Sequence, residues 1–154
     1  VAIALMIGGA VLILIERVGH RDSIATVHDI DFKHALAIGL FQCLAMFPGT
    51  SRSAATIIGA MILGASRPAA AEFSFFLAIP TMYAAGIYSL LKHLDQIQST
   101  QLLTLAVGFA VAFIVAWVVV AAFMRFIQTH KFTSFAIYRI IIGAIVLFVI
   151  LRPL

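Results

Sequence analysis

The stretch FPGTSRSAATIIGA, from Phe47 to Ala60, interrupts the hydrophobic pattern of this chain with four hydroxyl residues and one arginine. Two apolar runs of 13 residues, 35–47 and 54–66, flank its polar part. As a helix, each run would extend only about 20 Å, whereas the hydrocarbon core of a bilayer is about 30 Å thick. Neither run can therefore cross a membrane alone.

The composition is that of an integral membrane protein. Of the 154 residues, 64% are hydrophobic and 10% are charged, against about 45–50% and about 25% in soluble domains. The net charge of +4 therefore bears on orientation and on anionic lipids. Nucleic acid is not an expected partner, because no basic stretch interleaves with aromatic residues. The single cysteine, Cys43, excludes an intrachain disulfide.

The two short runs predict a re-entrant hairpin over residues 35–66, which enters the membrane to mid-depth and returns to the same face. Pro48 and Gly49 provide the break between its halves. Non-helical backbone at that depth must be buried in protein or line a wet cavity. The alternative is one kinked span of 32 residues with a polar interruption.

The remaining segments predict an all-α integral membrane protein with a single membrane domain over residues 1–154. Val1 already lies in an apolar run with no basic segment before it, so we expect this to be the C-terminal part of a longer protein. The expected segments are the end of a spanning helix (1–15), a cytoplasmic loop (16–34), the hairpin (35–66) and three spanning helices (69–91, 102–124 and 135–151).

Lysine and arginine counts favour the hairpin over the single span. If the hairpin returns to its own side, six basic residues share one face: Arg17, Arg21, Lys33, Arg67, Arg125 and Lys131. Lys92 and Arg152 lie on the other face. This bias predicts that the 16–34 loop is cytoplasmic and that Leu154 is extracytoplasmic. A full crossing would instead leave three basic residues on the face of the 16–34 loop and five on the opposite face.

The polar tip has the features of an anion site. The hydroxyls of Thr50, Ser51 and Ser53 suit an N-cap, and we expect the second half-helix to start at about Ser53-Ala54. Free N–H groups and the positive end of the helix dipole then favour an anion.

Arg52 would add a permanently charged, planar donor suited to phosphate oxygens. Thr56, three residues past Ser53, could turn its hydroxyl towards the same place. The alternative reading is structural: Arg52 caps backbone carbonyls or pairs with an acid.

The segment GLFQCLAMFPGTSRSAATIIGAMILGASRPAAAEFSFFLAIP, together with FAIYR near the end, resembles the undecaprenyl-diphosphate phosphatase family of bacterial membranes. The resemblance implies one half of an inverted-repeat architecture, in which each repeat has a re-entrant pair and spanning helices. It implies removal of the terminal phosphate of undecaprenyl diphosphate, which recycles the lipid carrier for cell-wall synthesis. It also implies that Ser51, Arg52 and Thr56 are active-site residues, with Arg52 binding the diphosphate.

The chain lacks the family's other signatures, an E-x-x-x-E pair and a PVSSTGH-like loop, which supply catalytic acid, serine and histidine residues. Its five histidines lie in or beside the links. The resemblance therefore makes this chain the second repeat, with a phosphate-binding half-site. A divalent cation, Mg²⁺ or Ca²⁺, is expected from the family, but no ligand cluster is evident in this chain and no metal-binding residue is assigned.

Other polar residues are weaker candidates. The predicted substrate-binding set is Gly49, Thr50, Ser53, Gln42 and Glu72. For Glu72 the alternatives are a pair with Arg67 or Arg52 and a solvated interfacial acid. Arg139, a turn into the last span, is expected to extend to the cytoplasmic interface.

Two functions remain open on physical grounds. A lipid-diphosphate phosphatase and a transporter or flippase for an anionic lipid or solute both use half-helix N-termini aimed at an anion. The loop resemblance favours the phosphatase. The expected location is the bacterial inner membrane, with lipid diphosphate and membrane lipids as partners, and a homodimer is left open.

The hairpin makes a topological prediction. Single cysteines at Ser23 and Ser66, introduced into a Cys43→Ser background, should both react with an impermeant maleimide from the cytoplasmic face. Labelling of the two positions from opposite faces would overturn the re-entrant topology.

Overall fold

The computed structural model describes residues 1–18, 23–93, 102–130 and 132–151, which form helices with no β-strand. Three of these helices are long and apolar enough to cross a membrane, α4, α5 and α6. The predicted all-helical membrane fold is therefore confirmed. The α-helices are α1 (Ala2–Val18), α2 (Phe32–Gln42), α3 (Arg52–Ile62), α4 (Arg67–Lys92), α5 (Leu102–Thr129) and α6 (Thr133–Leu151), with 3₁₀ turns at Val27–Asp29 and Cys43–Met46.

Two helix boundaries differ from the expected loop over residues 16–34. Helix α1 continues to Val18, so Glu16 lies inside the helix and does not open the loop. Helix α2 begins at Phe32, because the carboxylate of Asp31 accepts a hydrogen bond from the backbone N–H of His34 at 2.8 Å. This N-cap starts the helix three residues before the apolar run.

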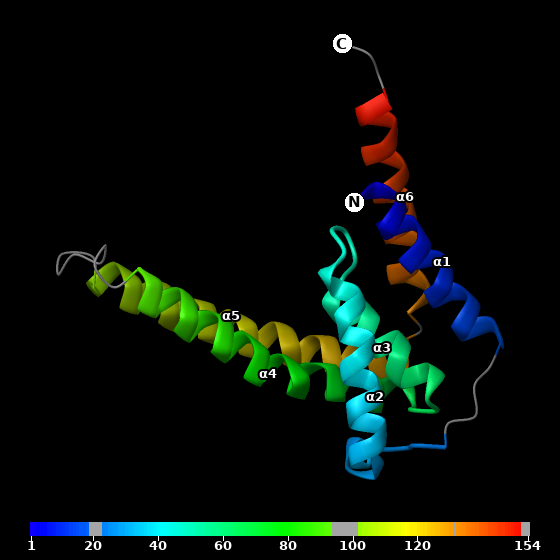
Figure 1. Ribbon diagram of the computed structural model, residues 1–154, viewed down its shortest axis with the longest axis horizontal. Helices are drawn as coiled ribbons and strands as arrows, with labels where there is room; N and C mark the ends of the chain where they lie inside the picture. Colours follow the sequence, from blue (N-terminus) through cyan, green and yellow to red (C-terminus); the bar gives the residue numbers. More distant parts are fainter. Residues whose placement is uncertain (19–22, 94–101, 131, 152–154) are drawn as a thin grey trace.

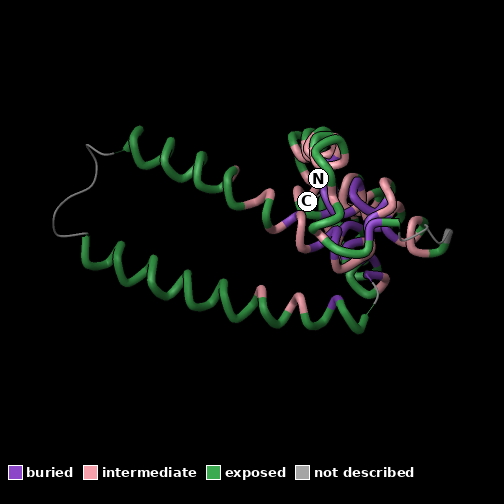
Figure 2. The backbone as a smooth tube through the Cα atoms, turned by 90° about the horizontal axis from the view of Figure 1, so that it is seen from below, coloured by how far each residue is buried: buried purple, intermediate pink, exposed green. Residues whose placement is uncertain are grey.

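The helices form two unequal parts (Figure 1). Helices α1 and α6 pack side by side, and the α2–α3 hairpin lies next to α1. Helices α4 and α5 run out together, crosswise to the α1–α6 pair. Figure 2 shows that the buried residues gather where α1, α3, the start of α4 and the start of α6 meet, whereas most of the α4–α5 hairpin is exposed. Its apolar side chains are therefore available to lipid or to other protein.

The two ends of the α2–α3 hairpin segment lie together. The N–H of Ile24 donates to the carbonyl of Gly64 at 3.0 Å, and the N–H of Ser66 donates to the carbonyl of Ile24 at 2.9 Å. Between the helices, a Cβ built on Gly59 would lie 2.5 Å from Cγ of Phe41. Only glycine at position 59 allows the two helices to approach so closely. The hydrogen bonds of Ile24 show that the chain returns to the point from which the hairpin started.

The hairpin tip lies level with the first residues of α1. A Cβ on Gly49 would lie 2.5 Å from Cα of Val1, and one on Gly143 would lie 3.0 Å from the carbonyl oxygen of Ala2. Gly143 is ten residues into α6, or about 15 Å from its start at 1.5 Å per residue. The tip is therefore about halfway along a helix that is long and apolar enough to span a membrane.

Glu16 joins three helices at the end of the molecule opposite the tip. Its side chain is only 3% exposed. It accepts hydrogen bonds from the N–H of Phe132 at 2.7 Å and from the hydroxyl of Thr133, and it lies 3.2 Å from Nε of Arg67. One carboxylate thus fixes the end of α1 to the starts of α4 and α6.

Some expectations fall outside the described residues. They are the extracytoplasmic position of Leu154 and the placement of Arg21, Lys131 and Arg152, on which part of the charge count rests.

Replacing Glu16 by alanine should destabilise the fold by about 3 kcal/mol, because the Phe132 N–H loses its acceptor and the Arg67 guanidinium loses its charge partner. Unfolding by a denaturing detergent would measure the change. The matched control is Glu72→Ala, which removes a half-buried acid that forms no ion pair among the described residues and should cost about 1 kcal/mol or less. Equal losses for the two variants would contradict the role given to Glu16.

Candidate functional site

The tip turn places a helix N-terminus inside the hairpin. Gly49 has a φ of 94°, a conformation that side chains disfavour, and the N–H of Thr50 donates to the carbonyl of Phe47 at 3.0 Å. The chain then extends at Ser51, whose hydroxyl accepts a hydrogen bond from the N–H of Ala54 at 3.3 Å.

Helix α3 therefore starts at Arg52, and the expected start at Ser53-Ala54 is wrong by one to two residues. The difference arises because Ser51, not Ser53, is the N-cap: its oxygen reaches the third helical N–H, the spacing that a capping serine prefers. The N–H groups of Arg52 and Ser53 are the two first-turn donors that this cap leaves free.

Arg52 is held by a hydroxyl and not by an acid. Its Nη1 donates to Oγ1 of Thr81 at 3.0 Å, and Thr81 donates in turn to the carbonyls of Leu77 and Ala78. No ion pair joins Arg52 to an acid among the described residues. Since one hydroxyl occupies one of its five N–H donors, the half-buried guanidinium keeps most of its donors available.

Thr56 is buried in the second turn of α3 and is not exposed to solvent. It is 1% exposed, and its hydroxyl lies 3.1 Å from the carbonyl of Arg52, 3.0 Å from that of Ser53 and 2.7 Å from Oγ of Ser74. A hydroxyl has one hydrogen. If Thr56 donates it to the carbonyls, Ser74 must donate to Thr56, so the pair locks the first turn of α3 to α4.

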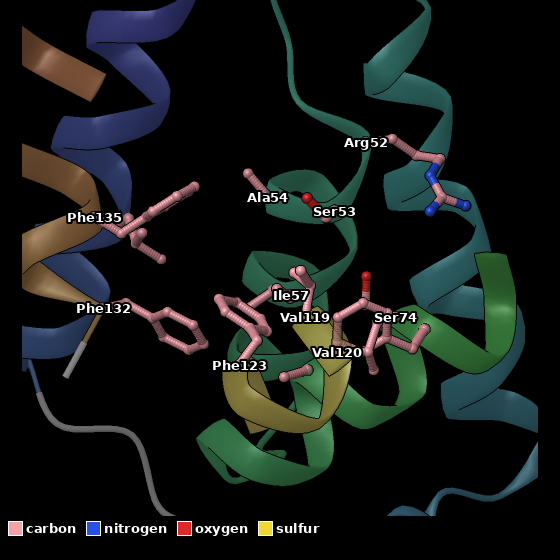
Figure 3. Close-up of a pocket in the computed structure, with 13 residues that line it drawn as sticks. Arg52, Ser53, Ala54, Ile57, Ser74, Val119, Val120, Phe123, Phe132 and Phe135 are labelled. Atoms are coloured by element: carbon pink, nitrogen blue, oxygen red, sulfur yellow. The ribbon is translucent and has the colours of Figure 1, made fainter. Parts of the chain in front are cut away.

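A cavity of about 250 Å³ adjoins the helix start. Figure 3 shows Phe132 and Phe135 on one side of it and Arg52 on the other. Its polar lining comes from Arg52 and Ser53 at the start of α3 and from Ser74 on α4, and the other lining residues are apolar. The lining residues are Leu12, Arg52, Ser53, Ala54, Ile57, Ala71, Ser74, Phe75, Val119, Val120, Phe123, Phe132 and Phe135.

The structure brings together some of the predicted site residues and separates others. Arg52 and Ser53 line the cavity beside the start of α3, and Ser51 caps the helix next to them. Gln42 lies at the end of α2, with its Oε1 buried and without a hydrogen-bond partner among the described residues. Glu72 lines a different cavity, between α4 and α5. Neither Gln42 nor Glu72 lines the cavity beside the start of α3.

A protein-family model described as "Bacitracin resistance protein BacA" matches residues 1–145 of this sequence. The chain belongs to the BacA family. Similar curated proteins include undecaprenyl-diphosphatase 1 of Chromobacterium violaceum, 52% identical over 96% of this chain and 54% of its own length. Undecaprenyl-diphosphatase 3 of Acinetobacter baylyi is 51% identical over 98% of this chain and 57% of its own. An undecaprenyl-diphosphatase of Pseudomonas putida strain GB-1 is 49% identical over 96% of this chain and 53% of its own length.

This BacA chain spans about half the length of the curated relatives it matches. Within the part that the structure describes, no three His, Cys, Asp or Glu residues gather as a metal site would require. His34 pairs with Asp31, and His93 and His130 contact backbone carbonyls of their own helices. These residues do not provide the cluster of oxygen ligands that a resident Mg²⁺ or Ca²⁺ requires.

The sequence interpretation of this BacA chain missed Ser74 and Thr81. They lie seven residues apart on α4, which places both hydroxyls on one face of an apolar helix. Thr81 also follows Pro80, which has no N–H to donate within the helix. Two hydroxyls with helical spacing inside a hydrophobic span are a signal that points to a buried polar contact, although not to its partner.

Thr56→Val should destabilise this BacA chain by about 1–3 kcal/mol, because it removes a buried hydroxyl and leaves Ser74 without its partner. Thermal unfolding in detergent, followed by circular dichroism, would measure the loss. Thr104→Val is the matched control, since Thr104 is exposed on α5 and its change should stay within about 0.5 kcal/mol. A Thr56→Val protein as stable as the control would contradict the role given to the Thr56–Ser74 hydrogen bond in holding α3 to α4.

Proposed function

We propose that this chain is the phosphate-binding half of a membrane phosphatase that removes the terminal phosphate of undecaprenyl diphosphate. The observation that carries the proposal is the start of α3: Arg52 lies at a helix N-terminus, with free donors, beside an apolar cavity. The names of the BacA relatives give the class of substrate, and membership of the family supports the reaction.

The helix start has the donors to bind a phosphate group. The N–H groups of Arg52 and Ser53 and the positive end of the α3 dipole favour an anion there. The guanidinium adds charge-assisted hydrogen bonds suited to phosphate oxygens. Such preorganised donors stabilise the charge that develops on the transferred phosphoryl group. In this proposal Arg52 acts on the substrate directly.

The neighbours of Arg52 prepare the site. Ser51 is engaged as the N-cap, and its hydroxyl lies 3.1 Å from that of Ser53. No acid or histidine in the described part of the chain hydrogen-bonds to it, so it lacks the base that a nucleophilic serine needs. We therefore assign Ser51, Gly49 and Thr50 to shaping the turn. Thr56 holds the first turn of α3 from below. A water molecule, or a hydroxyl from outside this chain, is the attacking group.

The apolar cavity suits the other part of the proposed substrate. A lipid diphosphate combines a strongly charged head with a long hydrocarbon chain. Most of the cavity lining is aromatic or aliphatic, whereas its Arg52 side is charged. A polyprenyl segment next to the phosphates would contact the phenyl rings of Phe132 and Phe135, and the head would face Arg52.

We also infer the placement in the membrane. Residues 23–25 and 64–66 lie together. Arg67, which follows them, pairs with Glu16, and Glu16 also bonds to the start of α6 at the same end of the molecule. We assign this end to the cytoplasm of a bacterial cell, because the basic residues favour it. The chain then lies in the inner membrane, with its C-terminus outside the cytoplasm.

Phosphate release from undecaprenyl diphosphate in detergent would test the activity. The enzyme would be this chain joined to the portion of the Chromobacterium violaceum relative that it does not match. Arg52→Ala should lower the turnover by about 100-fold or more, as expected for loss of a charge-stabilising donor. This 154-residue chain alone should release negligible phosphate.

Arg125→Ala is the matched control, because Arg125 is an exposed arginine near the end of α5; it should leave the turnover within twofold of the unsubstituted protein. Full turnover in the Arg52→Ala variant would show that Arg52 takes no part in catalysis. Substrate binding without hydrolysis, by an otherwise folded hybrid, would favour the transporter instead.

A further inference from the structure

Arg139 is a buried cation that the proposed site does not use. It is only 5% exposed, although it lies one and a half turns into α6. The expectation that it reaches the membrane interface is therefore wrong. Its side chain instead enters the seam between α6 and α1, where a Cβ on Gly8 would lie 3.0 Å from its Nη2. The absence of a side chain at Gly8 makes room for the guanidinium.

The seam holds this side chain in a narrow space. A Cβ on the neighbouring Gly9 would lie 2.8 Å from the carbonyl oxygen of Ala136 and 2.8 Å from Cγ1 of Ile140. The two adjacent glycines therefore have different roles. Gly9 allows the two backbones to approach closely, and Gly8 accommodates the arginine.

No acid among the described residues compensates this charge. Both Nε and Nη1 of Arg139 are buried without a hydrogen-bond partner in the described part of the chain. Of the carboxylates described, Glu16, Asp29 and Asp31 make other contacts. Glu72 lines the cavity between α4 and α5. An unpaired guanidinium is costly inside a membrane domain, which points to an anionic ligand.

The free donors of Arg139 lie about one helical turn from the cavity beside the start of α3. Arg139 follows Phe135 by four residues on α6, and Gly8 precedes Leu12 by four residues on α1, so each pair shares a helix face. Phe135 and Leu12 both line the cavity. The guanidinium, whose end lies against Gly8, is therefore about one helical turn from the cavity wall.

We propose that Arg139 and Gly8 form a second oxyanion site, which binds a phosphate group at the α1–α6 wall of the cavity. The guanidinium suits phosphate oxygens, and the adjoining apolar wall suits a phosphate carried by a hydrocarbon chain. The ligand class rests on the proposed function, whereas the site itself does not require hydrolysis by this chain. Free phosphate and a lipid headgroup share this chemistry, and the test separates them.

Binding can be measured with this chain purified in a maltoside detergent, which carries no phosphate. Isothermal titration would compare dodecyl phosphate, inorganic phosphate and dodecanol in an Arg52→Ala background, so that the α3 site does not contribute. Arg139→Met should weaken the binding of dodecyl phosphate about tenfold or more, the equivalent of one charge-assisted hydrogen bond. Arg125→Met is the matched control and should bind within twofold of the background protein.

Gly8→Ala provides a second variant if Arg139→Met fails to fold, as judged by circular dichroism. Its methyl group would displace only the flexible end of Arg139, so the helices should persist while binding weakens several-fold. Arg139-dependent binding of inorganic phosphate would identify the free ion as a ligand, and binding of dodecyl phosphate alone would identify a lipid headgroup. Unchanged binding in folded Arg139→Met or Gly8→Ala protein overturns the second site, whatever the phosphatase assay shows for Arg52.

Discussion

The contacts of Glu16 hold the cavity together. This buried carboxylate accepts from the first residues before and within α6 and lies against Arg67 at the start of α4. Each of these helices contributes one wall of the cavity: Leu12 from α1, Ser74 from α4 and Phe135 from α6. Because the short hairpin cannot anchor itself across a bilayer, its position depends on helices that Glu16 fixes at the opposite end. A single charged group thus sets the geometry of a site to which it makes no direct contact.

The hairpin itself was predictable from simple constraints. Two apolar runs too short to span a bilayer, separated by Pro48 and Gly49, lead to two short helices. The concentration of hydroxyls around Arg52 predicted a helix N-terminus there, and the helix begins at Arg52, one to two residues before the expected start. Chain length and capping chemistry are local properties, so the residues of the hairpin were sufficient to anticipate them.

The side-chain partners were not predictable in the same way. Arg139 was expected at the membrane interface, because an arginine near a helix end usually extends there. Its burial depends on Gly8, which lies 131 positions away in the sequence, and on the packing of α1 against α6. The contacts of Arg52 with Thr81 and of Thr56 with Ser74 likewise require knowing which face of α4 meets α3. Such pairings depend on the relative placement of whole helices, which the local pattern does not contain.

The hold of Thr81 on Arg52 couples the charged tip to the surroundings of α4. From Met82 onwards the residues of α4 are exposed and are available to lipid or to other protein. Thr81 is thus the last partly covered residue before that exposed length. A tilt of α4, such as a change in bilayer thickness produces, would move the hydroxyl that orients the guanidinium. The orientation of the Arg52 guanidinium therefore depends on where α4 lies relative to the start of α3.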